Sequence, residues 1–237
     1  MAYRSLDPHL IIETAERLET RIADRFPDAG LRKVGKELVS LARDIRDAAA
    51  ALEKPIWWLR ILVGVVIGLG ACMFLFVGTI LPFDRFSSGG DVVESVQGIE
   101  ASLNTVILAG LGLLALVRAE VTIKRHRVFR QLHGLRSLIH VIDMHQLTKD
   151  PAALSSTFTP TPHSPKRTMS RGDLLRYLDY CSEMLSITGK LAALFAQSVN
   201  DEVVIDAVND VENLGSNLSR KIWQKITMLN AEGRTAG

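Results

Sequence analysis

Two long uncharged runs constrain this chain more than any other feature of its sequence. Ile61 to Leu81 is a run of 21 residues without a charge, and Ala101 to Val117 is a run of 17. A helix needs about 20 residues to cross the hydrocarbon core of a bilayer. We therefore predict a membrane protein with two transmembrane helices, at residues 56–82 and 102–119, joined by a loop at residues 83–101.

The composition fits a protein with few spans. Of the 237 residues, 47% are hydrophobic and 23% are charged, which is too apolar for a disordered chain and too charged for a multi-spanning transporter. Cys72 lies in the first span and Cys181 in the last third, so neither a disulfide nor a cysteine metal site is expected. Residues 1–54 are polar and mixed in charge, so we expect the first span itself to target the chain to the membrane.

The distribution of charge predicts the orientation. The loop has a single basic residue, Arg85, against Asp84, Asp91, Glu94 and Glu100. The opposite ends of both spans are basic: they carry Arg43, Arg46, Lys54 and Arg60 before the first span, and Arg118, Lys124, Arg125, Arg127, Arg130 and Arg136 after the second. Basic residues near span ends mark the cytoplasmic side. We therefore expect a bacterial inner-membrane protein with both termini in the cytoplasm, an external acidic loop, and Trp57 and Trp58 at the inner interface.

Helical patterns continue on both sides of the spans. Asp7 and Pro8 are typical of a helix start, as N-cap and first residue, and the helix is expected to run to about Arg25. After a turn at residues 26–30, one apolar stripe follows at helical spacing: Leu31, Val34, Leu38, Leu41 and Ile45. The second span has no stop signal, so we expect one helix from about Leu103 to Leu147, roughly 65 Å long.

The last third is predicted to be a helical hairpin. Residues 148–169 are rich in Pro, Ser and Thr and are expected to be a linker. Ser170 and Asp173 resemble a capping box, and Asn200 is a candidate cap for the last helix. One continuous helix through Asn200 is the alternative, but it would leave a broad apolar face uncovered. The expected fold is all-α: an antiparallel transmembrane hairpin with a cytoplasmic bundle built from residues 1–55, 120–147 and 170–237.

Four polar residues near the end of the long helix form a candidate site: His133, His140, Asp143 and His145. His126, His133 and His140 recur every seven residues and therefore share one face. His133 and His140 are about 10 Å apart, too far to share a metal, whereas His140 and Asp143 are close enough to touch. We favour a polar or interface face; a metal site, a pH-sensitive contact and an active site remain alternatives.

Signatures of common enzyme chemistry are missing from the sequence. There is no Gly-x-Ser-x-Gly, no Walker loop and no dinucleotide fingerprint. The carboxylate pairs Asp179/Glu183 and Asp206/Asp210 are interpreted as exposed helix faces. No enzyme activity, metal or cofactor is therefore expected.

The basic segment after the second span has two interpretations. Lys124, Arg125, Arg127 and Arg130 can simply set the topology, or they can bind anionic lipid headgroups at about 1 kcal/mol each. Nucleic acid is a poor fit, because the net charge is only +2 and these residues are expected to lie against the bilayer.

Small residues in the two spans follow the spacing of a helix-packing seam. The positions are Gly64, Gly68, Ala71, Leu75 and Gly78 in the first span, and Thr105, Ala109, Gly112, Leu116 and Ala119 in the second. In an antiparallel pair, Gly68 would face Leu116, so each leucine meets a small residue. The outward faces are then almost wholly apolar, and Asn104 and Thr79 form no continuous polar stripe. Constitutive ion conduction is therefore not expected.

The layout of the whole chain resembles that of uncharacterised bacterial two-transmembrane proteins, including two-span effector domains proposed to act in phage defence. We favour a membrane-anchored, non-enzymatic scaffold or adaptor that forms a homo-oligomer and recruits a cytoplasmic protein through its C-terminal hairpin. The resemblance implies the first alternative, a membrane-perturbing or pore-forming effector activated by oligomerisation. The second alternative is an enzyme or metal protein that uses His140 and Asp143.

Overall fold

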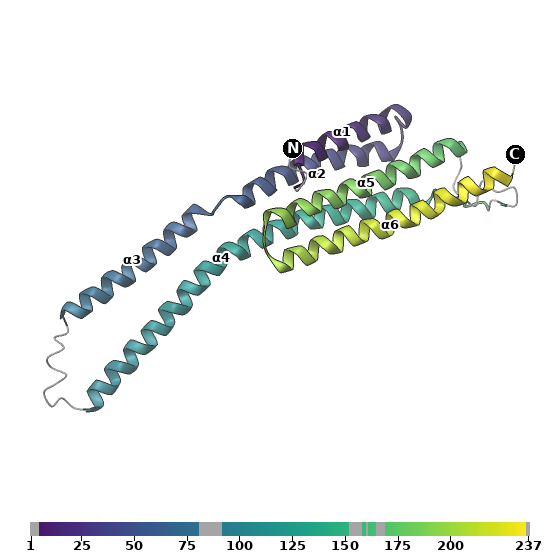
Figure 1. Cartoon of the computed structure of the whole chain (residues 1–237). Helices are drawn as coiled ribbons and strands as arrows, with labels where there is room; N and C mark the ends of the chain where they lie inside the picture. Colours follow the sequence, from purple (N-terminus) through teal and green to yellow (C-terminus); the bar gives the residue numbers. More distant parts are fainter. Residues whose placement is uncertain (1–4, 81–91, 152–157, 160, 165–168, 236–237) are drawn as a thin grey trace. The chain divides into compact units, whose positions relative to one another are not determined.

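All regular secondary structure in the described residues is helical, as predicted. The computed structural model describes residues 5–80, 92–151, 158–159, 161–164 and 169–235, with backbone alone at 73–80, 92–99, 101–102 and 232–235. It contains no strand in these residues. The helices are α1 (Pro8–Arg25), α2 (Gly30–Glu53), α3 (Trp57–Ile80), α4 (Val92–Leu147), α5 (Arg171–Ser198) and α6 (Glu202–Thr235), as labelled in Figure 1.

The chain divides into two compact units. Residues 1–53 and 126–237 form the first, which we call the bundle unit, and residues 54–125 form the second, which we call the apolar unit. Helix α4 contributes to both. Half of the predicted linker at 148–169, and all of residues 83–91 in the predicted loop, lie outside the described residues.

Two of the three predicted helix caps are confirmed. Asp7 accepts a hydrogen bond from the His9 N–H at 2.8 Å, and Pro8 is the first residue of α1. The Ser170 hydroxyl accepts from the Asp173 N–H at 3.1 Å and donates to the Asp173 carboxylate at 2.7 Å. The bonds from the His9 and Asp173 N–H groups satisfy donors that the helix ends leave unpaired, and the remaining bond joins the two side chains of the Ser170 cap.

The third cap prediction and the predicted start of α4 are wrong. Asp201, not Asn200, caps α6, because its carboxylate accepts from the Val204 N–H at 3.1 Å. Aspartate and asparagine are equally good caps, so the sequence does not choose between neighbours. Helix α4 begins at Val92, so residues 92–101 are helical instead of part of the loop. Only one glycine, Gly98, opposes helix formation there, at a cost of about 1 kcal/mol.

Helix α5 is the centre of the bundle unit. Its buried apolar side chains cover the broad apolar face expected from the sequence: Leu174, Tyr177, Leu178, Tyr180, Cys181, Met184, Leu185, Ile187, Leu191, Ala192, Leu194 and Phe195. Helices α1, α2 and α6 pack against it. The ring of Phe26, between α1 and α2, meets Tyr177 and Tyr180 edge-on at 5.5 and 6.2 Å. The wide apolar face is therefore covered from several sides.

Helices α4 and α6 lie side by side and run in the same direction. A Cβ atom built at Gly215 of α6 would lie 3.8 Å from Ile139 Cδ1 of α4. Farther along both helices, Lys225 Nζ donates to Gln146 Oε1 at 2.6 Å. An apolar stripe of α4 at helical spacing is buried from Val128 to Ile142, and Val121, in the apolar unit, is exposed. Helix α6 returns antiparallel to α5, which confirms a hairpin in place of one continuous helix.

Because α5 is buried on most sides, we predict that Leu178→Ala destabilises the bundle strongly. The Leu178 side chain is fully buried, so truncation removes about 2–5 kcal/mol from the free energy of unfolding. Urea unfolding of the full chain in mild detergent, followed by circular dichroism, measures the loss. The matched control is Leu10→Ala, because Leu10 is 53% exposed; an equal loss in both variants would contradict the central position of α5.

Candidate functional site

Two helical stretches are long and apolar enough to cross a membrane. They lie within Gly30–Cys72 and Leu103–Leu147, and only 6% and 0% of their apolar windows are buried. The core helix of a soluble protein would bury most of such a window. Trp57 and Trp58, at the start of α3, are 69% and 60% exposed. The apolar unit thus presents a large apolar surface that water solvates poorly.

The predicted seam of small residues is not closed in this structure. A Cβ atom built at Gly64, Gly68 or Gly112 would meet no described atom within 4 Å. Ala71, Thr105 and Ala109 are exposed, and Ala119 is half-buried. Gly78 belongs to the part of α3 for which only the backbone is described. The packing of these positions against one another therefore stays a prediction.

A carboxylate links α4 to the beginning of α3. Glu120 Oε1 accepts from the Ile56 N–H at 3.4 Å, and Glu120 Oε2 lies 3.6 Å from Arg60 Nε. Lys124, one turn later on α4, pairs with Glu120 at 3.2 Å. The Glu120 side chain is 18% exposed, and Lys124 is 19% exposed. Charged groups thus meet where the apolar stretches of both helices end. The sequence did not predict this contact of Glu120 with Arg60 and Ile56.

The candidate headgroup-binding residues differ in exposure. Lys124 is engaged by Glu120, and Arg125 is half-buried. Arg127 and Arg130 are exposed and have no described ion pair. This pair of arginines is the part of the segment that can reach an external anion without first breaking an internal contact.

The candidate histidine site does not form a joined constellation. His133 and His140 are exposed, and His145 is half-buried against the start of α2, where its ring lies next to Gly30. Asp143 accepts from the Gln146 side chain at 2.6 Å, not from His140. Among the described residues no group of three or more His, Cys, Asp or Glu could hold a metal ion.

A different polar cluster lies at this end of α4. Gln146 is 3% exposed and bridges Asp143 and Lys225, whose Nζ donates to both the side chain and the backbone oxygen of Gln146. Burial lowers the pKa of Lys225, while Asp150 and Asp143 oppose that change. Cys181 is also buried, and burial raises its thiol pKa to about 12, so it is a poor nucleophile. Sequence reasoning missed Gln146 and Lys225 because the register of α6 on α4 is tertiary information.

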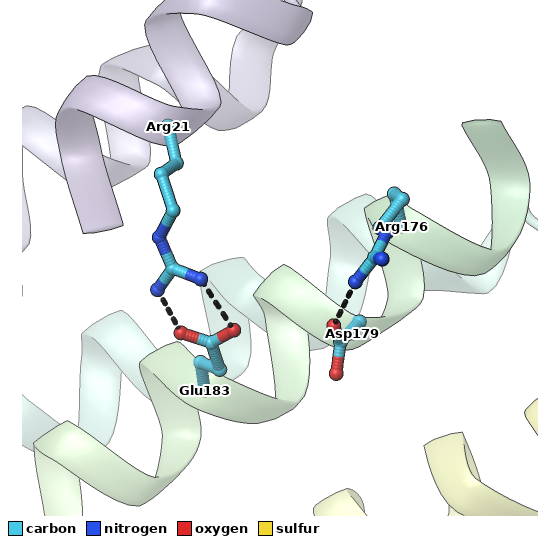
Figure 2. Close-up of polar contacts among 4 residues, drawn as sticks. All are labelled: Arg21, Arg176, Asp179 and Glu183. Carbon is cyan, nitrogen blue, oxygen red and sulfur yellow. Dashed lines mark hydrogen bonds and ion pairs between the residues drawn. The ribbon is translucent and has the colours of Figure 1, made fainter. Parts of the chain in front are cut away.

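Ion pairs join α1 to α5. Arg21 makes a two-pronged contact with Glu183, as Figure 2 shows, and its guanidinium lies 5.5 Å from the Tyr180 ring centroid. Arg25 pairs with Asp173 at 2.9 Å. Glu183, predicted to belong to an exposed face, is 33% exposed in this pair. Since both partners of each pair are partly solvated, water screens their attraction, and the pairs act mainly to align the helices.

An open groove runs between α5 and α6 on the bundle. Its volume is about 520 Å³, and its lining includes Lys190, Glu212, Arg220 and Trp223. Trp223 is 53% exposed. Within the groove, Lys190 Nζ donates to Ser186 Oγ at 2.6 Å.

Comparisons with known proteins give no match: no protein-family model, no curated protein and no solved structure is similar to this chain.

We predict that Gln146→Leu destabilises the bundle by about 1–3 kcal/mol, because the half-buried Lys225 ammonium loses its nearest acceptor. Urea unfolding measures the change, and adding Lys225→Met should recover part of it. Gln224→Leu, the same substitution at an exposed position of α6, serves as the control. An unchanged midpoint for Gln146→Leu would show that the cluster adds no stability.

Proposed function

We propose that this chain is a membrane-anchored, non-enzymatic helical scaffold or adaptor of a bacterial inner membrane. The observation that carries the proposal is the contrast between its two units. The apolar unit exposes nearly all of its apolar windows, whereas the bundle unit has a buried core and a charged surface. A bilayer is the solvent that matches the first surface, and the cytoplasm matches the second.

In this proposal α3 and the first part of α4 form an antiparallel transmembrane hairpin. Both termini and the bundle are cytoplasmic, and the acidic loop is external. The excess of basic residues at the two cytoplasmic ends supports this orientation. The pairing of Glu120 with Arg60 and Lys124 supports it as well, because charges gather where the apolar stretches end. The tryptophans at the start of α3 suit an interface with lipid headgroups.

The basic segment is proposed to bind anionic lipids. Arg127 and Arg130 are the principal candidates, because they are exposed and have no described ion pair. Lys124 and Arg125 add charge but are held by other contacts or partly covered. Attraction of about 1 kcal/mol per basic residue near an anionic surface strengthens the anchoring.

A binding role is proposed over catalysis because several candidate reactive side chains in the bundle are engaged in structural contacts or buried. Asp143 and Lys225 meet at Gln146, Glu183 pairs with Arg21, and the Cys181 thiol is buried. The remaining exposed surface, including the α5–α6 groove, is available to a cytoplasmic protein partner. Self-association through the membrane or the bundle completes the proposed scaffold.

The topology is tested by a cysteine at Ser88 in a Cys72→Ser background. An external loop predicts that a membrane-impermeant maleimide labels this cysteine in intact cells. A cysteine at the exposed Ser216 of α6 is the control, and it should react only after lysis. Labelling at Ser88 that also requires lysis would reject the proposed orientation.

The small-residue seam is tested by cysteines at Gly68 and Leu116 of one chain in native membranes. A closed hairpin predicts an intramolecular crosslink between these two cysteines. The control pair has cysteines at Val66 and Leu116; because Val66 lies on another face of α3, this pair should crosslink much less. Crosslinking only between chains would place the seam in an oligomer instead. Steady ion flux through the purified protein in liposomes would favour the effector function over the scaffold.

A further inference from the structure

Two exposed faces of the bundle unit carry opposite charge. The first, the α4 outer face, consists of Arg130, His133, Ser137, His140, Met144 and Leu147, with Arg136 beside it. The second, the α6 outer face, consists of Asp206, Asp210, Asn213, Asn217, Arg220 and Gln224. Every one of these side chains is exposed, and within each face the spacing alternates between three and four residues, as in a helix-packing seam.

The α4 outer face is unusual in its lack of acidic neighbours. From Val121 to Ile142 the helix contains no aspartate or glutamate. Arg130 and Arg136 have no described ion pair, whereas Arg21, Arg25 and Arg43 each contact a carboxylate on another helix. On α6, Asp206 and Asp210 likewise have no described ion pair. Both faces therefore keep charges that an external partner can neutralise.

The two faces are in register. Gly215 and Ile139 mark the same level of the parallel helices α6 and α4. Asp206 precedes Gly215 by nine residues, and Arg130 precedes Ile139 by nine. At 1.5 Å per residue, Asp206 and Arg130 lie at the same level along the bundle, and Asp210 lies within about 3 Å of the level of Arg136. Basic and acidic residues thus occupy the same stretch of the two helices.

We propose that a second copy of this chain docks on these faces, with α4 of each copy lying against α6 of the other. A twofold axis parallel to the two helices and between them makes this contact twice and keeps every residue at its own level. Arg130 then faces Asp206 of the second copy, and Arg136 faces its Asp210. Ser137 of one copy and Asn213 of the other are both small and neutral. They face each other at a level along the bundle between these charged pairs and Gly215.

Exposed apolar residues extend the same surface. Phe129 of α4 is 39% exposed and Val203 of α6 is 44% exposed, and both lie beside the complementary charges. Met144 and Leu147 are 67% and 61% exposed at the other end of the α4 outer face. Burial of this apolar area adds to the charge attraction, which on its own is screened by salt.

The inference rests on the proposed function in one respect. Two copies anchored in the same bilayer meet at a high effective concentration, so a modest interface of polar and apolar contacts is sufficient. The arrangement specifies the self-association that the proposed scaffold requires, and it leaves the α5–α6 groove available to a different partner.

Charge reversal on two differently tagged full-length chains tests the pairing. One chain carries Arg130→Glu with Arg136→Glu, and the other carries Asp206→Lys with Asp210→Lys. Each variant alone brings like charges together in both contacts, so self-association measured in nanodiscs or mild detergent should weaken by about tenfold or more. The mixture restores opposite charges in both contacts, so the two chains should pair with each other at or near the native affinity.

A matched control separates this effect from a change in net charge. Lys33→Glu with Lys36→Glu reverses two exposed charges on α2 and should leave self-association unchanged. An acidic partner protein, in place of a second copy, would respond to the α4 reversal but not to the α6 reversal. A lipid surface alone would respond to the α4 reversal in binding to anionic vesicles, but self-association would be unchanged by either reversal. Self-association that responds to only one of the two reversals, or to neither, would overturn the proposal.

Crosslinking tests the geometry independently. In a Cys72→Ser background, Ser137→Cys in one tagged chain and Asn213→Cys in the other should join through a short bis-maleimide linker. Ser137→Cys mixed only with itself should join poorly, and efficient joining there would show that α4 packs on α4 and would overturn the arrangement. Extraction with alkaline carbonate tests the membrane anchor separately. If the chain stays in the membrane but shows neither crosslinking nor charge rescue, the dimer is refuted and the membrane anchor still stands.

Discussion

The bundle depends on the burial of one helix that is apolar on most of its surface. Helix α5 exposes little more than a narrow strip that includes Arg176, Ser186 and Lys190, and no single partner can cover the rest. Helices α1, α2 and α6 therefore pack on it. The neighbours are drawn from opposite ends of the chain, so burial of α5 brings residues before the first candidate span together with residues after the second. The free energy comes mainly from apolar area removed from water, and the ion pairs to α1 contribute alignment.

The arginines around this core differ in whether they have an ion-pair partner within the bundle, and this difference bears on the proposed function. Arginines of α1 and α2 are used inside the bundle, for instance Arg21 with Glu183 and Arg43 with Glu16. Arg127, Arg130 and Arg136, on the exposed side of α4, have no described ion pair within the bundle. Arg127 and Arg130, near the apolar unit, suit anionic headgroups, and Arg130 together with Arg136 matches the acidic side of α6 in a second copy. The same helix thus supports both proposed associations of the scaffold, with the membrane and with itself.

Much of the local structure could be predicted because it depends on residues close together in the sequence. Asp7 with Pro8 and Ser170 with Asp173 mark helix starts through bonds that span two or three residues. The buried stripe from Val128 to Ile142 follows from helical periodicity alone. The errors at Asn200 and at residues 92–101 arose where two neighbouring residues cap equally well, or where a polar segment is compatible with both loop and helix.

The candidate site could be predicted far less well. The sequence alone determined that this chain is all-helical, that two stretches are apolar enough to cross a membrane, and that charge is distributed unevenly around them, because hydropathy and periodicity are properties of the chain itself. Only the tertiary structure decided that Asp143 bonds Gln146 instead of His140, that Lys225 completes this cluster, and that Asp206 lies level with Arg130. Those facts depend on the register and rotation of helices separated by tens of residues, which side-chain packing sets and no local pattern encodes.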